Sequence, residues 1–146
     1  MITLRETIVS EIPLFVEMEQ ATETSEFIIG YSLTQHFDAM QKPEIVYLSI
    51  LSAGLLAGFI ILAIDDGDKS VEFRRIVVAT KGQGIGQLAI LAMEAYCVEK
   101  LGCDRVWLDV FTSNKRGQHI YEKLGYKPFK TGEYKGAQLL FFDKKL

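Results

Sequence analysis

Three glycines at alternate positions stand in one short stretch of this 146-residue chain, GQGIG (82–86). The β-branched pair Val77 and Val78 precedes the stretch, and an apolar segment of helical character follows it. A glycine loop that leads into a helix directs backbone N–H groups and the positive end of the helix dipole toward one point. Such a point suits a phosphate group.

Two familiar phosphate-binding motifs do not match this spacing. A Walker loop requires G-x-x-x-x-G-K-[ST], and here no lysine followed by Ser or Thr ends the run. The dinucleotide fingerprint requires G-x-G-x-x-G, whereas Gly82, Gly84 and Gly86 are two positions apart. A merely flexible connection is the alternative, although three glycines cost conformational entropy that a plain connection does not need to lose.

The elements that must position this loop follow from the hydrophobic periodicity. The sequence predicts a strand at 71–78, a helix at 85–101 and a parallel strand at 105–110, which together form a βαβ crossover. The prediction is an α/β fold (an α+β mixed sheet, not a doubly wound one) in a single domain over residues 1–146. Further strands are predicted at 3–8, 45–51, 55–64, 127–131 and 138–143, and helices at 11–20, 32–41 and 114–124, the last ended by Gly125 in a left-handed cap.

One segment raises the question of a membrane span. Residues 46–64 carry no charge, over a length close to the roughly 17–25 residues that a bilayer helix needs. Ser52, Ala53 and Gly54 interrupt the segment with turn residues, and each half has the length and composition of a strand. A buried β-hairpin is therefore the prediction, and an integral membrane protein, which would need detergent, is the disfavoured alternative.

Composition and charge indicate a cytoplasmic protein with an uneven charge distribution. The chain has two cysteines, too few for a disulfide framework, and its start lacks the features of a signal peptide. Residues 1–73 carry three basic and twelve acidic groups, and residues 74–146 carry thirteen basic and seven acidic groups, so the halves have net charges of −9 and +6. Seven of the acidic groups fall between Arg5 and Lys42, where no Lys or Arg occurs. This run is either a solvated helix face or a region that attracts cations.

Lys81-x-x-Gly84-x-Gly86 resembles the R/Q-x-x-G-x-G/A loop of the GNAT superfamily of acetyl-CoA-dependent N-acetyltransferases. The preceding VEFRRIVV, the following RVWLDV and the later NKRGQHIYEKLGYKP extend the resemblance over roughly residues 71–128. The chain departs from the family where Lys81 replaces the usual Arg or Gln, where the connection from Val78 to Lys81 is short, and where Gly117 stands in place of a common Ala. The resemblance implies a GNAT fold, with a central mixed β-sheet, flanking helices and a βαβ cofactor-binding core.

The resemblance also implies acetyl-CoA as the acyl donor. In that family the loop holds the pyrophosphate of coenzyme A, mostly through backbone N–H groups. The pantetheine arm is expected to pair with Val77 and Val78, and Asn114 is similar to the family's Asn that contacts the cofactor arm. An N-cap role is the alternative for Asn114, and the two roles could coexist. The expected contacts of the loop are Lys81, Gly82, Gln83, Gly84, Ile85, Gly86 and Gln87.

Amine attack on a thioester needs a group that takes the ammonium proton, a donor for the tetrahedral oxygen, and a proton for the departing thiolate. The resemblance suggests Tyr121 as the general acid, Glu72 as the base, and the backbone N–H near Val78 as the oxyanion donor.

Each of the two side chains has a structural alternative. Tyr121 makes an apolar helical stripe with Ile120 and Leu124, which by itself favours core packing. Glu72 alternates with Val71 and Phe73, and a surface ion pair with a nearby Arg is its alternative. Strict alternation predicts that Glu72 shares one face of its strand with Arg74, Ile76 and Val78.

The acceptor is the least determined part of the prediction. His36 is a candidate for the acceptor pocket, because the resemblance puts the amine site beside the second helix, and neither histidine has ligand spacing for a metal. The acidic run predicts a cationic acceptor. The sequence therefore predicts an N-acetyltransferase that acts on a small-molecule amine or a protein or peptide amine, by direct attack in a ternary complex. No nucleic-acid or membrane partner is expected, a homodimer is left open, and a catalytically inactive acyl-CoA sensor is the alternative.

Overall fold

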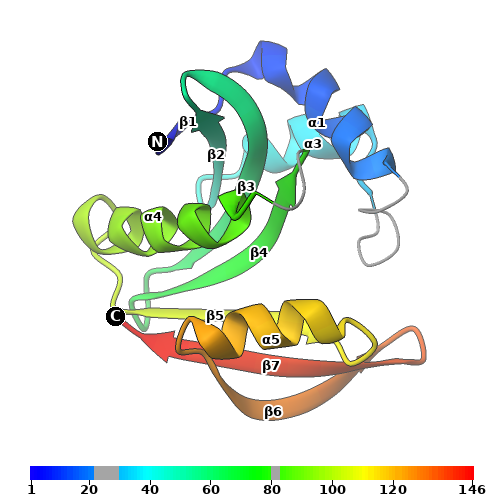
Figure 1. Cartoon of the computed structure of the whole chain (residues 1–146), viewed down its shortest axis with the longest axis vertical. Coiled ribbons are helices and arrows are strands. Elements are labelled where there is room, and N and C mark those ends of the chain that lie inside the picture. Colours follow the sequence, from blue (N-terminus) through cyan, green and yellow to red (C-terminus); the bar gives the residue numbers. More distant parts are fainter. Residues whose placement is uncertain (22–29, 80–82) are drawn as a thin grey trace.

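A mixed sheet of seven strands forms the centre of the protein, in the order β1-β2-β3-β4-β5-β7-β6 (Figure 1). The computed structural model describes residues 1–21, 30–79 and 83–146. Neighbouring strands are antiparallel except for β4 and β5, which run parallel, so the predicted mixed sheet and its βαβ crossover are confirmed. The strands are β1 (Ile2–Glu6), β2 (Ile45–Ser52), β3 (Leu55–Asp65), β4 (Ser70–Val78), β5 (Arg105–Phe111), β6 (Lys127–Tyr134) and β7 (Ala137–Lys145).

Helices cover both faces of this sheet. Helices α4 (Ile85–Glu99) and α5 (Lys115–Lys123) pack on one face, where their apolar side chains join a large core cluster. The opposite face carries a smaller core cluster under α1 (Ile12–Gln20) and α3 (Leu33–Met40). A single 3-10 turn, η1 (Val9–Glu11), leads from β1 into α1. All four predicted helices are present, and their ends differ from the predicted ones by at most two residues.

The uncharged segment 46–64 forms the predicted hairpin of β2 and β3 in the middle of one half of the sheet. Ala53 and Gly54, with φ angles of 51° and 82°, connect the strands. Two successive residues of positive φ are typical of the tight turn that matches the twist of a hairpin. Leu48, Ile50 and Ile60 are fully buried, because helices cover both faces of the sheet at this point. None of the helices in the described part of the chain is long and apolar enough to span a membrane.

Candidate active site

The parallel strands β4 and β5 separate after a short contact. They pair only where Ser70, Val71 and Glu72 lie beside Arg105–Trp107. Beyond this contact the two strands diverge, as Figure 1 shows for the green β4 and the yellow β5. This divergence leaves backbone groups on the facing edges of β4 and β5 without a neighbouring strand. We call the space between these two edges the gap.

The backbone of Val78 faces the gap. Val78 lies opposite Gly58 of β3, and the next residue, Ala79, donates its N–H to the carbonyl oxygen of Ala57 at 2.8 Å. Hydrogen-bonded and non-hydrogen-bonded pairs alternate along an antiparallel ladder, so Gly58 and Val78 form a non-hydrogen-bonded pair. The N–H and C=O of Val78 therefore point away from β3, in keeping with the predicted oxyanion donor.

The same alternation separates Ile76 from Val77. The backbone groups of Ile76 point toward the gap together with those of Val78, whereas those of Val77 point toward β3. The sequence-based prediction was a pairing of the pantetheine arm with Val77 and Val78, and it did not include Ile76. The signal that could have found Ile76 is the two-residue period counted back from Val78. A ligand that pairs with this strand edge is therefore expected to use Ile76 and Val78.

The start of α4 has the geometry of an anion site. Gly84 is the N-cap residue and has a φ of +72°, a conformation that favours glycine. The first helical hydrogen bond runs from the N–H of Leu88 to the carbonyl of Gly84, so the N–H groups of Ile85, Gly86 and Gln87 have no acceptor within the helix. Apart from its chain neighbours, no described residue has an atom within 4 Å of the place that a Cβ atom on Gly84 would take, which leaves space for a ligand on this side.

Close packing brings this helix start to the end of β4. A Cβ atom on Gly86 would lie 3.9 Å from a side-chain methyl of Val78, so the loop and the gap are adjacent. Gln83 is exposed beside Gly84. The predicted contacts Lys81 and Gly82 lie outside the described residues.

Asn114 serves as the N-cap of α5. Its side-chain oxygen accepts a hydrogen bond from the N–H of Gly117 at 2.9 Å, which confirms the capping alternative. A Cβ atom on Gly117 would lie 2.7 Å from the Asn114 amide nitrogen. This close approach is a physical reason for glycine where the resembling family commonly has alanine. A cofactor contact by Asn114 stays a prediction.

Tyr121 lies on the α4 and α5 side of the gap, where two aromatic rings and the turn that ends α5 fix its position. The ring packs against Phe73 and Tyr126 with centroid separations of 6.2 and 6.0 Å. Gly125, with a φ of +98°, ends α5 as predicted, and the N–H of Tyr126 closes the turn on the Tyr121 carbonyl at 3.0 Å. Within the described residues the Tyr121 hydroxyl has no hydrogen-bond partner. Burial, assisted by the charge of Asp109, raises the pKa of Tyr121 to about 12.

The predicted face of Glu72 is wrong, because β4 contains a bulge. Leu62 of β3 pairs with Phe73, and the preceding residue of β3 pairs with Arg75, so Arg74 is an extra residue in the ladder. Glu72 therefore does not share a face with Ile76 and Val78, which point toward the α4 side. It shares the opposite face with Arg75. The Glu72 carboxylate also accepts a hydrogen bond from Arg74 at 2.8 Å, which is the ion pair that the alternative described.

Asp109 of β5 is a candidate site residue that the sequence patterns did not predict. The strand pairing places it two residues beyond Trp107, the partner of Glu72, and on the same face of the sheet. Loss of surrounding water and the charge of Glu72 raise the pKa of Asp109, and Arg74 opposes this rise. A carboxylate inside the otherwise apolar stretch VWLDVF was the available signal.

His36 lies apart from the gap in a fully buried position on α3. Both of its ring nitrogens have protein partners, so direct contact with an acceptor would require the surrounding packing to open. Within the described residues no group of three or more His, Cys, Asp or Glu side chains could hold a metal ion.

The arrangement suits a long, anionic acyl donor. The open helix start could hold its phosphates, the unpaired edge of β4 could bind an extended amide-containing arm, and the gap leads past Tyr121 to the carboxylates of Glu72 and Asp109. Tyr121 and the two carboxylates lie on opposite faces of the sheet. Two reactants could therefore meet in the gap from opposite sides.

Comparisons with known proteins agree with this description. Aminoglycoside acetyltransferase AAC(6')-Ib, solved in complex with coenzyme A, has a TM-score of 0.85 at 15% sequence identity, covering 99% of this chain and 95% of that chain. A dodecameric spermidine N-acetyltransferase from Vibrio cholerae has a TM-score of 0.82 at 18% identity, covering 99% and 93%. At these identities the likeness shows the fold alone. No curated protein matches the chain in a sequence comparison.

The sequence itself carries the family signal. The model of the Acetyltransferase (GNAT) family matches residues 12–126, from the start of α1 to just beyond α5. This match covers the βαβ core, the open helix start and Tyr121. The protein therefore belongs to the GNAT family of acetyltransferases, which use acetyl-CoA as the acyl donor.

Proposed function

We propose that this protein transfers the acetyl group of acetyl-CoA to a primary amine, by direct attack of the amine in a ternary complex. The observation that carries the proposal is the gap, with Tyr121 on one face of the sheet and the carboxylates of Glu72 and Asp109 on the other. Acetyl-CoA approaches from the α4 and α5 side, where the open helix start binds its pyrophosphate. The amine approaches from the side of α1 and α3.

In this proposal the groups at the gap act at three points of the reaction. Glu72 takes the ammonium proton of the acceptor through one water molecule, which generates the neutral nucleophile. The N–H of Val78 donates a hydrogen bond to the carbonyl oxygen as negative charge develops on it. Tyr121, as the general acid, donates its hydroxyl hydrogen in a strong hydrogen bond to the sulfur as the bond from carbon to sulfur breaks.

Direct transfer is proposed because the cysteines are poor candidates for a covalent acyl intermediate. Cys97 and Cys103 are buried in the core. Burial raises the pKa of Cys97 to about 12, and it also raises that of Cys103. The thiolate form that attacks an acyl donor is therefore scarce at neutral pH.

The proposed acceptor is a small cationic amine. Glu72 and Asp109 provide carboxylates at the side from which the amine approaches, and a second ammonium group of the acceptor would be stabilised there. Spermidine and aminoglycosides, named for the two structurally similar acetyltransferases, are amines of this class. A basic peptide terminus belongs to the same class and is part of the test.

Self-association of two copies is a further part of the proposal. Leu88, Leu91 and Val98 lie at helical spacing on α4, and each is 46–53% exposed. Burial of this stripe against a second copy would remove apolar surface from water. Sedimentation velocity at several protein concentrations tests it, and a monomer at all concentrations refutes it.

The activity is tested by the release of thiol from acetyl-CoA in the presence of a panel of amines. The panel contains polyamines, aminoglycosides, a basic peptide, and neutral and acidic amino acids, with an amine-free reaction as the control. Amine-dependent release and an acetylated product support the proposal. Tight acetyl-CoA binding with no amine-dependent release would instead favour the acyl-CoA sensor.

A further inference from the structure

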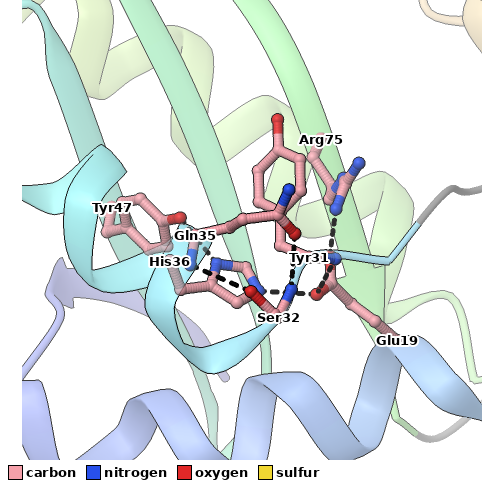
Figure 2. A network of polar contacts seen from close by, with 7 residues as sticks. All are labelled: Glu19, Tyr31, Ser32, Gln35, His36, Tyr47 and Arg75. Atoms are coloured by element: carbon pink, nitrogen blue, oxygen red, sulfur yellow. Dashed lines mark hydrogen bonds and ion pairs between the residues drawn. The ribbon is translucent and has the colours of Figure 1, made fainter.

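Four elements contribute to a buried polar network on the α1 and α3 side of the sheet (Figure 2). We call it the Glu19 network. It consists of Glu19 of α1, His36 of α3, Tyr47 of β2 and Arg75 of β4. Glu19, His36 and Tyr47 are at most 5% exposed. None of these side chains has a role in the chemistry proposed above.

Hydrogen bonds of this network occupy both ring nitrogens of His36. Nε2 of His36 lies 2.6 Å from Oε1 of Glu19, and Nδ1 lies 2.6 Å from the hydroxyl of Tyr47. Since a carboxylate only accepts hydrogen bonds, Nε2 is the donor to Glu19. Nδ1 faces the hydroxyl of Tyr47, and burial raises the pKa of that hydroxyl. Arg75 pairs with the other carboxylate oxygen of Glu19.

A network of this kind is a costly way to stabilise a protein. Burying an ion pair requires removing water from both charges, and apolar side chains of similar size often stabilise a fold as well or better. Loss of one partner is strongly unfavourable because it leaves the other charge buried and unpaired. Such a network is therefore suited to holding a side chain in one defined place.

The group that the network holds is the end of the segment before α3. The N–H of Tyr31 donates to Glu19 at 3.3 Å, and the Tyr31 ring lies over the guanidinium of Arg75 at 4.2 Å. Figure 2 shows the ring beside Arg75 with its hydroxyl end pointing away from Glu19. Ser32 and Gln35 lock the same point through a reciprocal capping box, with distances of 3.1 and 2.7 Å.

This aromatic ring stands near the candidate base. Arg75 follows the bulged Arg74, and Arg74 pairs with Glu72. The Tyr31 ring packs on Arg75, and Arg75 shares the α1 and α3 face of β4 with Glu72, so the ring lies over the face that carries the candidate base. Tyr31 is partly exposed, whereas the residues beneath it are buried.

We propose that Glu19, His36 and Arg75 are positioning residues that hold the Tyr31 ring as an aromatic wall of the acceptor site, beside Glu72. The proposal rests on the acetyltransferase function proposed above and adds a specificity residue to it. An aromatic face attracts a cation, so the wall favours an acceptor with a cationic or cation-bearing chain. His36 thus contributes to the acceptor site through Glu19, without touching the acceptor.

The test compares two buried carboxylates of the same chain. Glu19→Gln removes the charge that holds Arg75 and Tyr31, whereas Glu11→Gln removes a carboxylate that Arg5 and Ser49 bind at the other end of α1. Tyr31→Leu removes the ring and Tyr31→Phe removes its hydroxyl alone, and in both variants the backbone N–H of residue 31 can still donate to Glu19. Calorimetry measures the affinity of spermidine for the protein saturated with coenzyme A, and a second titration measures the affinity for coenzyme A.

We expect Glu19→Gln and Tyr31→Leu to weaken spermidine binding by about tenfold, the order of one cation–aromatic contact. Tyr31→Phe retains the ring and restores the affinity, and the affinity for coenzyme A changes less than about twofold in all variants. The control Glu11→Gln lowers the melting temperature without weakening spermidine binding. If Glu19→Gln fails to fold, the two Tyr31 variants decide the question.

Unchanged amine affinity in Tyr31→Leu, or equal losses in the Glu19 and Glu11 variants, would overturn the proposal. Calorimetry does not require turnover, so failure of the acetyltransferase proposal is seen separately. If the wild type binds amine beside coenzyme A but releases no thiol from acetyl-CoA, the positioning role stands and the proposed reaction fails. If no amine of the panel binds, both proposals fail.

Discussion

Replacing Tyr121 by Phe tests the proposed chemistry with the smallest change to the structure. The substitution removes one hydroxyl and keeps the ring, whose contacts with Phe73 and Tyr126 have centroid separations of 6.2 and 6.0 Å. The hydroxyl has no hydrogen-bond partner within the described residues, so its removal leaves no group in that part of the chain unpaired. The free energy of unfolding should therefore change by less than about 0.5 kcal/mol.

The expected loss of activity follows from the pKa of Tyr121. Burial raises this pKa to about 12, whereas a thiol has a pKa of about 8.5, so complete proton transfer to a free thiolate would be uphill by about 5 kcal/mol. Tyr121 can act only while the bond from carbon to sulfur breaks, by donating a strong hydrogen bond to the developing thiolate. Such a bond contributes about 1.5–3 kcal/mol. The Tyr121→Phe variant should therefore lose about 10²-fold in kcat, the lower end of the range for general acids.

The assay is the release of thiol with the best amine of the panel, followed from about pH 6 to pH 10. A raised pKa means that Tyr121 keeps its proton over this whole range and loses it only near pH 12. The variant should therefore show a lower rate and an unchanged pH profile, with unchanged affinity for coenzyme A. Full turnover with a lowered melting temperature would mean that Tyr121 is only a core residue. A basic limb below pH 10 that disappears in the variant would refute the argument from burial.

Four further substitutions test the start of α4, the acid stability of the fold, and the contact between β3 and β4. Gly84→Gln should weaken coenzyme A binding at the start of α4. The control Gly102→Gln, at a similar positive φ beyond the other end of α4, should lower stability alone. If calorimetry gives both variants the same affinity for coenzyme A, the proposed site is refuted. The hydrogen bond from Arg5 lowers the pKa of Glu11 from 4.5 to about 2, so Glu11 stabilises the fold above pH 4.5 by at most about 3 kcal/mol and loses this contribution as the pH falls through 2. When the free energy of unfolding is measured at decreasing pH, Glu11→Gln should therefore show a smaller loss of stability in acid. An equal loss in the variant and the wild type would contradict this. Gly58→Ala should lower the melting temperature and the affinity for coenzyme A together, because the new Cβ atom would lie 2.1 Å from a carbonyl oxygen of β4. An unchanged melting temperature would show that β3 and β4 can move apart at this point without loss of stability.

Local signals in the sequence predicted most of the fold. The hairpin follows from two apolar runs and the turn residues Ala53 and Gly54, and Gly125 marks the end of α5. Each of these features depends on neighbouring residues, whose types restrict the backbone directly. The open helix start at Gly84 was predictable for the same reason.

The bulge at Arg74 was not predictable in this way. One extra residue in a strand leaves no mark in the composition, yet it reverses the face of every residue on one side of it. The two-residue period therefore placed Glu72 beside Ile76, although the pairing with β3 puts it beside Arg75. The face of Glu72 depends on a partner strand, and the sequence of β4 alone does not contain that information.

The Glu19 network was hidden for a different reason. Glu19 lies 17 positions from His36 and 56 positions from Arg75, so no local pattern connects them. Their types agree with a solvated helix face, which was the alternative for the whole acidic run. Glu11 is likewise bound by Arg5. Two carboxylates that the charge count assigned to the surface are therefore inside ion pairs, and the acidic residues of the run that stay exposed among those described are Glu6, Glu17 and Asp38.

The ion pairs of Glu11 and Glu19 weaken long-range attraction as the reason for a cationic acceptor. The net charge of −9 in residues 1–73 suggested long-range attraction, but a carboxylate paired with an arginine contributes little field at a distance. Attraction must then come from groups at the gap, and there Arg74 already compensates Glu72. Asp109 supplies a second carboxylate on the same face of the sheet, and loss of water and the charge of Glu72 raise its pKa. A cation bound beside Asp109 would stabilise the charged carboxylate at a distance of a few ångströms. Salt screens such a short-range attraction far less than it screens steering across a surface. In the proposed function, the preference for a cationic amine depends on the position of Asp109 and on the proposed aromatic wall, and the charge asymmetry of the chain is not needed to explain it.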